Sequence, residues 1–166
     1  MGLPKLSIPP RVKVLEALGA LADGRARRVQ SDLFEVTSSD SSRTYRVYVK
    51  RVGLKEYIVC STDNGTVYRG YVGYPIIAVM ALNGYLSRDR DVEETLSGIP
   101  WRKLNEELRK YVLVESEALK IASSRGIDPR VVSSTVEKVI EELKKLTIFF
   151  DPSACGVSHE EKEITD

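Results

Sequence analysis

Residues 44–74 read TYRVYVKRVGLKEYIVCSTDNGTVYRGYVGY, and this stretch decides the expected fold. Six of the eight tyrosines of the chain lie in it. The alternation of apolar and polar residues predicts three antiparallel strands joined by two tight turns. Asn64-Gly65 supplies the positive φ angles of a two-residue hairpin turn, and Gly53 suits the strained position of the other turn.

These turns set a register, and the register assigns each side chain to one face of the predicted sheet. Lys50 is expected opposite Tyr57, and Tyr48 opposite Val59, because side chains alternate along a strand. The face expected to pack on the core carries Tyr45, Val47, Val49, Ile58 and Cys60. The other face combines cations with aromatic rings and carries Arg46, Tyr48, Lys50, Tyr57, Val59 and Tyr68.

A face of this kind is typical of single-strand nucleic-acid binding. Nucleobases stack on flat rings at roughly 1–3 kcal/mol per base, while Arg and Lys contact the phosphates. The residues expected to stack bases are Tyr48, Tyr57 and Tyr68. Those expected to contact phosphates are Arg43, Arg46 and Lys50, with Arg25, Arg27 and Arg28 at the rim. The alternatives are that tyrosine is simply a half-buried strand residue, or that the face binds a protein.

The composition predicts one soluble domain of ordinary size. The chain has 166 residues, of which 42% are hydrophobic and 30% charged, so it can bury a core. No apolar run reaches the roughly 18 residues of a membrane span, and the N-terminus lacks a signal-peptide pattern. We therefore expect a cytoplasmic protein that does not contact a membrane.

The two cysteines predict neither a disulfide nor a metal site. Cys60 is expected in the core and Cys155 in a tail, so no bond between them is expected. His159 is the one histidine, which leaves too few ligands for a structural zinc site. No metal and no other cofactor is expected. Gln30 is the one glutamine, and scarce amides beside many charges favour a hot-adapted source.

Charge is distributed unevenly, although the net charge is only +1. Residues 1–72 carry 12 Lys and Arg against 7 Asp and Glu, and residues 73–166 carry 13 against 17. A basic half fits a polyanionic ligand. Residues 151–166 are acidic, and we expect them to form a flexible tail that competes for the basic face. Chance asymmetry is the alternative.

Helices are expected before and after the sheet. A helix should begin at about Arg11, after two prolines, and residues 75–82 should form a helix that is apolar on nearly every side and therefore buried. Trp101 is expected in the core. The pattern predicts an α+β fold in which about five helices pack on one face of a four-stranded antiparallel sheet that begins at Leu33–Thr37.

The last helix is expected to begin at the N-cap Asp128. Its apolar residues step alternately by four and three, as in a coiled-coil seam, and they are Val132, Val136, Val139, Leu143 and Leu146. We predict a zipper-like homodimer interface, with packing on the chain's own domain as the alternative. The expected parts are a nucleic-acid-binding domain (1–127), a dimerisation helix (128–150) and an acidic tail (151–166).

The sequence carries no pattern typical of an enzyme. No glycine-rich phosphate loop follows a strand, and a Ser-His-Asp set cannot form around a single histidine in a tail. The sharpest acidic cluster, from Asp89 to Glu94, is expected to be a solvated helix start. We therefore expect a binding protein without catalytic activity.

The order of elements and three local strings resemble the ThermoDBP-type single-stranded-DNA-binding proteins of hyperthermophilic archaea. The strings are GYPIIAV (73–79), GIPWRKLN (98–105) and the seam from Val132 to Leu146. The resemblance covers about residues 10–150. It implies a small α+β domain that binds single strands in a basic, aromatic-lined cleft and dimerises through its last helix. DNA is favoured over RNA through this resemblance alone.

A second resemblance is to the SWIM zinc module. It is carried by Arg28-Val29, Phe34–Val36, Tyr45–Val47 and the apolar helix after Pro75. Of the four zinc-ligand positions only Cys60 matches, because Thr62, Gly73 and Pro75 occupy the others. This resemblance implies a metal-free relic and supports the alternative function, a dimeric protein–protein adaptor.

Overall fold

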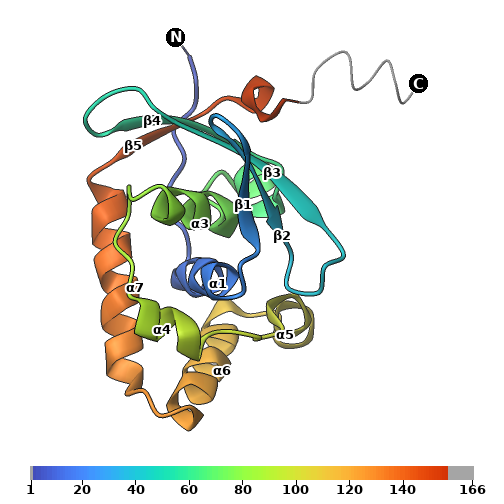
Figure 1. Cartoon of the computed structure of the whole chain (residues 1–166), viewed down its shortest axis with the longest axis vertical. Coiled ribbons are helices and arrows are strands. Elements are labelled where there is room, and N and C mark those ends of the chain that lie inside the picture. The colour runs from blue at the N-terminus through green and yellow to red at the C-terminus, as the bar shows by residue number, and fades with distance from the viewer. Residues whose placement is uncertain (1, 157–166) are drawn as a thin grey trace.

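The computed structural model describes residues 2–156 (Figure 1). Its helices are α1 (Arg11–Ala22), α2 (Asn64–Arg69), α3 (Tyr74–Leu82), α4 (Arg90–Thr95), α5 (Trp101–Leu108), α6 (Tyr111–Ser124) and α7 (Pro129–Lys144), followed by the short 3-10 helix η1 (Pro152–Cys155). Its strands are β1 (Ala26–Gln30), β2 (Leu33–Thr37), β3 (Thr44–Arg51), β4 (Glu56–Ser61) and β5 (Thr147–Phe150). The α+β class is confirmed. His159 and most of the expected acidic tail lie outside the described residues.

The sheet has five strands in the order β1-β2-β3-β4-β5. The first four pair antiparallel, but β5 pairs parallel with β4, so the prediction of a four-stranded, all-antiparallel sheet is wrong in detail. A parallel pair requires a long crossover, and the helices from α2 to α7 provide it. Arg27 and Arg28 lie within β1, and Arg25 immediately precedes it.

The helices gather on one side of the sheet. Figure 1 shows α3 against the sheet, α1 beneath α3, and α7 along the flank before the chain enters β5. Pro75 lies in the first turn of α3, and Ile76, Ile77 and Met80 are at most 1% exposed. The prediction of a central buried helix is confirmed, and so is the core position of Trp101, which is 3% exposed.

The expected hairpin turn at Asn64-Gly65 is instead the first turn of α2. The Asp63 side chain accepts hydrogen bonds from the Thr66 backbone N–H at 3.1 Å and from the Thr66 hydroxyl at 2.9 Å. This N-cap satisfies a backbone donor that a hairpin would pair across strands, so it favours a helix. Gly65 is required there, because a Cβ would lie 2.5 Å from the Tyr71 ring.

The register between β3 and β4 differs by one residue from the prediction. Tyr48 pairs with Cys60 and Arg51 pairs with Tyr57, because the turn between the strands is one residue longer than expected. A one-residue slip moves every side chain of a strand to the opposite face. Tyr57 and Val59 therefore lie in the core, at 3% and 0% exposed, and not on the outer face.

The seam of α7 packs inside the chain itself. Val132, Val136, Val139 and Leu143 are at most 2% exposed, and Leu146 is half-buried against the same core. Their neighbours are α1, α6 and α4. Because these residues are already covered by the chain's own helices, the prediction of a dimer interface there is wrong. A periodic apolar stripe does not by itself show which surface covers it. The helix also continues directly into β5, so it belongs to the same core as the sheet.

A disulfide joins Cys60 to Cys155, against the prediction. The register shift places Cys60 on the outer face of β4, and β5 carries the chain back to that face. η1 then contacts β4 and β3 on the side away from α3. Within residues 2–156, no helix is long and apolar enough to cross a membrane.

Candidate functional site

The outer face of the sheet, on the side away from α3, retains only part of the predicted binding set. Arg46, Tyr48 and Lys50 alternate along β3 with buried valines, so they lie together on this face. Tyr48 is half-buried, and its pKa is raised, chiefly by that burial. Tyr57 is in the core, and Tyr68 projects from α2, so the expected row of three stacking tyrosines does not form.

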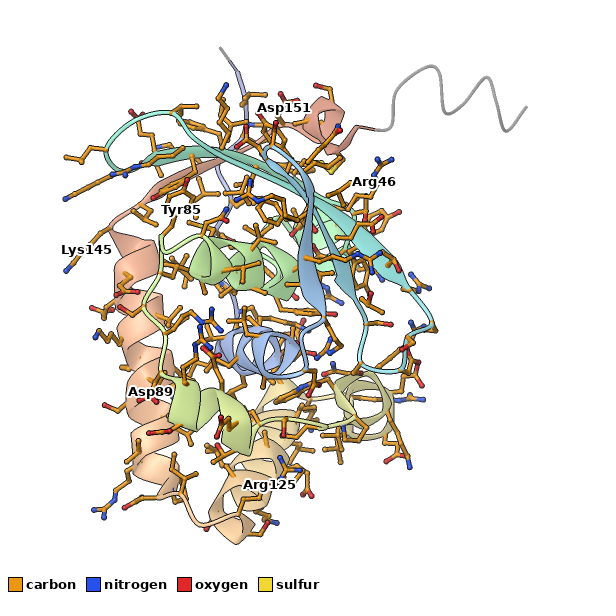
Figure 2. The ribbon with its side chains drawn as sticks, viewed as in Figure 1. Arg46, Tyr85, Asp89, Arg125, Lys145 and Asp151 are labelled. Atoms are coloured by element: carbon orange, nitrogen blue, oxygen red, sulfur yellow. A yellow bond between two sulfur atoms is a disulfide. The ribbon has the colours of Figure 1, made fainter. Side chains whose placement is uncertain are left out.

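The chain's own C-terminal segment covers part of this outer face. Arg46 lies on the same side of the sheet as the segment after Asp151 (Figure 2), and its guanidinium donates a hydrogen bond to the Gly156 carbonyl at 3.4 Å. Cys60 is only 3% exposed beneath the same segment. A nucleic-acid strand laid along β3 and β4 would meet this segment.

The three arginines around β1 point in three directions. Arg27 lies on the outer face and forms an ion pair with Glu35 at 2.5 Å. Arg28 lies on the other side, where its guanidinium stacks 4.9 Å from the Phe34 ring centroid. Arg25 precedes β1, forms an ion pair with Asp23 at 3.3 Å and donates to the Thr37 carbonyl at 2.8 Å.

A cavity of about 300 Å³ lies on the inner side of the sheet, between α1, α2, α5 and the β2–β3 loop. Arg25 and Arg43, two of the predicted phosphate-contacting residues, lie on its wall. Sequence reasoning placed Arg43 with Arg46, but the structure places these two side chains on different sides of the sheet. The other charged and aromatic residues of the wall are Lys13, Glu16, Asp63, Arg102, Glu106, Tyr45, Tyr71, Tyr74 and Trp101.

Three tyrosines form the aromatic part of this cavity. The rings of Tyr45 and Tyr74 meet edge-to-face, with centroids 6.1 Å apart. The Tyr71 hydroxyl lies 3.3 Å from the hydroxyl of Tyr111. Burial raises the pKa of all three cavity tyrosines, so they stay neutral near pH 7. A neutral phenol can both donate and accept a hydrogen bond.

A buried carboxylate lies in the wall of the same cavity. Glu16 is 2% exposed, and its Oε1 accepts a hydrogen bond from Asn105 Nδ2 at 2.6 Å. Its Oε2 lies 2.8 Å from the Lys13 ammonium, a charge contact without hydrogen-bond geometry, and receives no hydrogen bond. Glu16 is therefore held between Lys13 and Asn105 in the wall, and it links α1 to α5.

Among the described residues, three buried side-chain atoms have no hydrogen-bond partner, and all three belong to residues on this wall. They are Glu16 Oε2, Arg25 Nη2 and Trp101 Nε1. Trp101 Nε1 packs closely on α1, at Gly19. All three atoms are shielded from solvent by their neighbours, and Glu16 Oε2 forms an ion pair with Lys13 at 2.8 Å, so they belong to the packed wall behind the cavity and not to its open surface.

Cations and further aromatic rings surround the cavity mouth. Arg43 is exposed, and its side chain makes no hydrogen bond or ion pair with the rest of residues 2–156. Arg102 contacts Asp40 at 3.5 Å and remains partly exposed. Tyr68 is 81% exposed and lies one helical turn after Asn64, which lines the cavity, so both share one face of α2.

Glu16 was missed by sequence reasoning, although a signal was present. It stands in the run VKVLEALGAL (12–21), where apolar residues surround a single carboxylate on both sides. Such a charge in the middle of a buried helix requires nearby partners, which Lys13 and Asn105 supply. Asn105 comes from α5, far away in sequence, so that pairing is visible only in three dimensions.

Residues 6–149 match the family described as uncharacterised conserved protein UCP014422, and the chain belongs to that family. No curated protein and no solved structure matches the chain. In the described part of the chain, no group of three or more His, Cys, Asp or Glu side chains could hold a metal ion. Cys60, the one position that matches the SWIM ligand pattern, is committed to the disulfide.

Proposed function

We propose that the protein binds single-stranded nucleic acid, and that it does so at the cavity on the inner side of the sheet. One base enters the cavity among Tyr45, Tyr71 and Tyr74, and the phosphates on either side of it follow the cations at the mouth. The observation that carries the proposal is the cavity itself, because it combines three tyrosine rings with Arg43, an exposed cation whose side chain makes no hydrogen bond or ion pair within residues 2–156.

The cavity mouth supports a strand that extends beyond one nucleotide. Tyr68 offers an exposed ring on the α2 side, where the next base can stack. Arg43 and Arg102 flank the opening on the side of the β2–β3 loop. DNA is proposed over RNA on the resemblance to the ThermoDBP-type proteins alone, and a homodimer would have to use a surface other than the α7 seam.

Binding of a labelled oligo-dT, followed by fluorescence anisotropy at low and high salt, tests this proposal. Affinity should fall steeply with salt, because each neutralised phosphate contributes a slope of about −0.7 in the logarithmic plot for single strands. Arg43→Ala should reduce that slope by about 0.7. Arg130→Ala removes an equally charged side chain, 91% exposed on α7, and should leave binding unchanged.

A second candidate function is a protein–protein adaptor. Val112 and Leu113, at the start of α6, are 77% and 45% exposed, and exposed apolar side chains of this kind favour a protein partner. An adaptor would show no salt-dependent binding of the labelled strand. Absence of that signal at low salt would therefore reject the nucleic-acid proposal and leave the adaptor.

A further inference from the structure

We propose that the tip of the β3–β4 hairpin docks on an anionic membrane surface. The tip consists of residues 52–55 and lies at the opposite end of β3 from Arg43 and the cavity (Figure 1). A contact there goes beyond the proposed function, because a strand bound in the cavity would lie at the other end of β3. It also departs from the expectation, drawn from the sequence, that the protein does not contact a membrane.

Two aliphatic side chains of the tip face solvent. Leu54 is 79% exposed and Val52 is 49% exposed, and Leu54 exceeds every other large aliphatic side chain of residues 2–156 in exposure. Transfer of such side chains from water into an apolar medium is favourable. Leucine is also one of the residues that proteins bury at the boundary between lipid headgroups and acyl chains.

The backbone of the tip is largely satisfied by hydrogen bonds within the hairpin. The Arg51 guanidinium donates to the Gly53 carbonyl at 3.1 Å and to the Leu54 carbonyl at 2.7 Å. The backbone N–H groups of Val52 and Gly53 both donate to the Glu56 carbonyl, at 2.9 Å and 3.2 Å. Because unpaired backbone groups are costly outside water, the bonds that fix this turn also reduce the cost of moving it into the lipid interface.

Lysines surround the apolar tip. Lys50 and Lys55 flank it in sequence, and Lys145 lies near it, because the Thr147 backbone N–H donates to the Lys55 carbonyl at 2.8 Å. Figure 2 shows Lys145 on the same side of the molecule as the hairpin. All three lysines are exposed, and within residues 2–156 their ammonium groups form no hydrogen bond or ion pair. Their charge complements that of anionic lipids, which attract lysines close to the membrane surface.

The composition of the tip favours a lipid surface over a nucleic acid. Residues 50–56 contain no aromatic ring on which a base could stack. Arg51, the side chain best suited to a phosphate group, uses N–H groups on carbonyls of the turn. Glu56 is the one acid there, and its carboxylate packs against Gly53. Long lysine stems can lie along the apolar tip while their ammonium groups reach the lipid headgroups.

Flotation of the full-length chain with lipid vesicles tests the inference. The probes are vesicles of phosphatidylcholine alone and vesicles of phosphatidylcholine and phosphatidylserine in equal amounts. We expect the chain to float with the second kind only, and the bound fraction should fall as salt screens the lysines. Equal flotation with both kinds would contradict the role of charge. No flotation with either kind at low salt would overturn the inference and would leave the cavity proposal untouched, since oligo-dT binding measures that separately.

Matched variants separate docking of the tip from simple adsorption. Leu54→Ser should weaken vesicle binding about tenfold, because it removes the apolar tip. Leu113→Ser makes the same change on α6, where the side chain is 45% exposed, and should have no effect. Lys55→Ala should weaken binding and reduce its salt dependence, whereas Lys120→Ala, which removes an exposed lysine of α6, should do neither.

The same variants show which result would reject the docking of the tip. Unchanged vesicle binding by the folded Leu54→Ser variant would mean that the chain only adsorbs through its charge. Both tip variants should bind oligo-dT like the wild type, because the cavity lies at the other end of β3. A tip variant that loses oligo-dT binding but keeps vesicle binding would show that the tip contacts nucleic acid and not lipid.

Discussion

The outer face of the sheet and the cavity on its inner side both draw tyrosines from residues 44–74, yet they differ in what they offer a ligand. Tyr48 lies on the outer face of β3, and η1 packs on the same face. Tyr45, Tyr71 and Tyr74 gather around a cavity whose wall also carries Arg25 and Arg43. Aromatic and cationic residues close in sequence therefore do not by themselves define a binding surface, because a shift of one residue decides which side of a sheet they reach.

The largest expected effect concerns the disulfide that holds η1 on the outer face. Replacing Cys60 and Cys155 together by serine should lower the free energy of unfolding by about 4–5 kcal/mol, because the bond closes a loop of 95 residues. Guanidinium unfolding with and without a reductant measures this, and the double variant should not respond to the reductant. Single-strand binding at 25 °C should stay unchanged, because the cavity lies on the other side. Loss of binding by the folded variant would show that the outer face takes part.

A smaller effect tests the register that separates the two sides. Tyr57→Ala should lower the free energy of unfolding by about 3 kcal/mol, because the ring is buried and packs 5.0 Å from the Tyr85 ring centroid. Tyr48→Ala should cost about 1 kcal/mol or less, because that side chain is partly exposed. Urea unfolding of both variants gives the comparison. Small and similar costs for the two variants would instead support the register predicted from the sequence, in which both rings lie on the outer face.

The two sides of the sheet should differ in how well they stack bases. Tyr68→Ala should weaken binding of an oligo-dT about tenfold, within the roughly 1–3 kcal/mol that one stacked base contributes. Tyr48→Ala should leave the affinity unchanged, since its ring is on the outer face. Both affinities can be measured by anisotropy under the same salt conditions. A larger loss for Tyr48→Ala would move the binding site back to the outer face.

The smallest effect is the contribution of a cavity tyrosine to alkaline stability. Burial raises the pKa of Tyr74 above its ordinary value of about 10, so this phenol stays neutral in the folded chain while it ionises in the unfolded chain. The folded state therefore loses stability as pH rises above 10, by about 1 kcal/mol between pH 10 and 11 from this group. Tyr74→Phe should remove that part of the slope in urea unfolding series. An unchanged slope would mean that Tyr74 ionises equally in both states.

Local patterns predicted the elements that depend on neighbours in sequence. The proline and the all-round apolar run of α3 predicted a central helix, and Asp128 caps α7 by accepting from the Arg130 backbone N–H at 2.8 Å, as expected. The turn at Asn64-Gly65 failed because two local signals compete there. Asn64 and Gly65 could form either a hairpin turn or the first turn of a helix. The Asp63 side chain caps the helix by accepting from the Thr66 backbone N–H, so the helix forms.

Features that depend on distant partners could not be predicted from the sequence. The periodicity of α7 was correct, but a stripe of valines has the same period whether a second chain or α1 and α6 cover it. Cys60 and Cys155 meet only because β5 joins the sheet beside β4. The cavity combines Glu16, Arg25 and Trp101 from three separate segments, so it exists only in the folded chain.

The strand order also leaves the sheet with two well-protected borders. β1 is the outermost strand on one side, where Arg27 and Arg28 and an irregularity before Gln30 discourage any further strand from adding. On the other border, Phe150 donates its backbone N–H to the Pro4 carbonyl at 2.8 Å, and Leu6 donates to the Ile148 carbonyl at 2.9 Å. The N-terminal residues thus occupy the positions through which a neighbouring molecule would extend the sheet. The chain should therefore resist aggregation by strand addition even when it is concentrated.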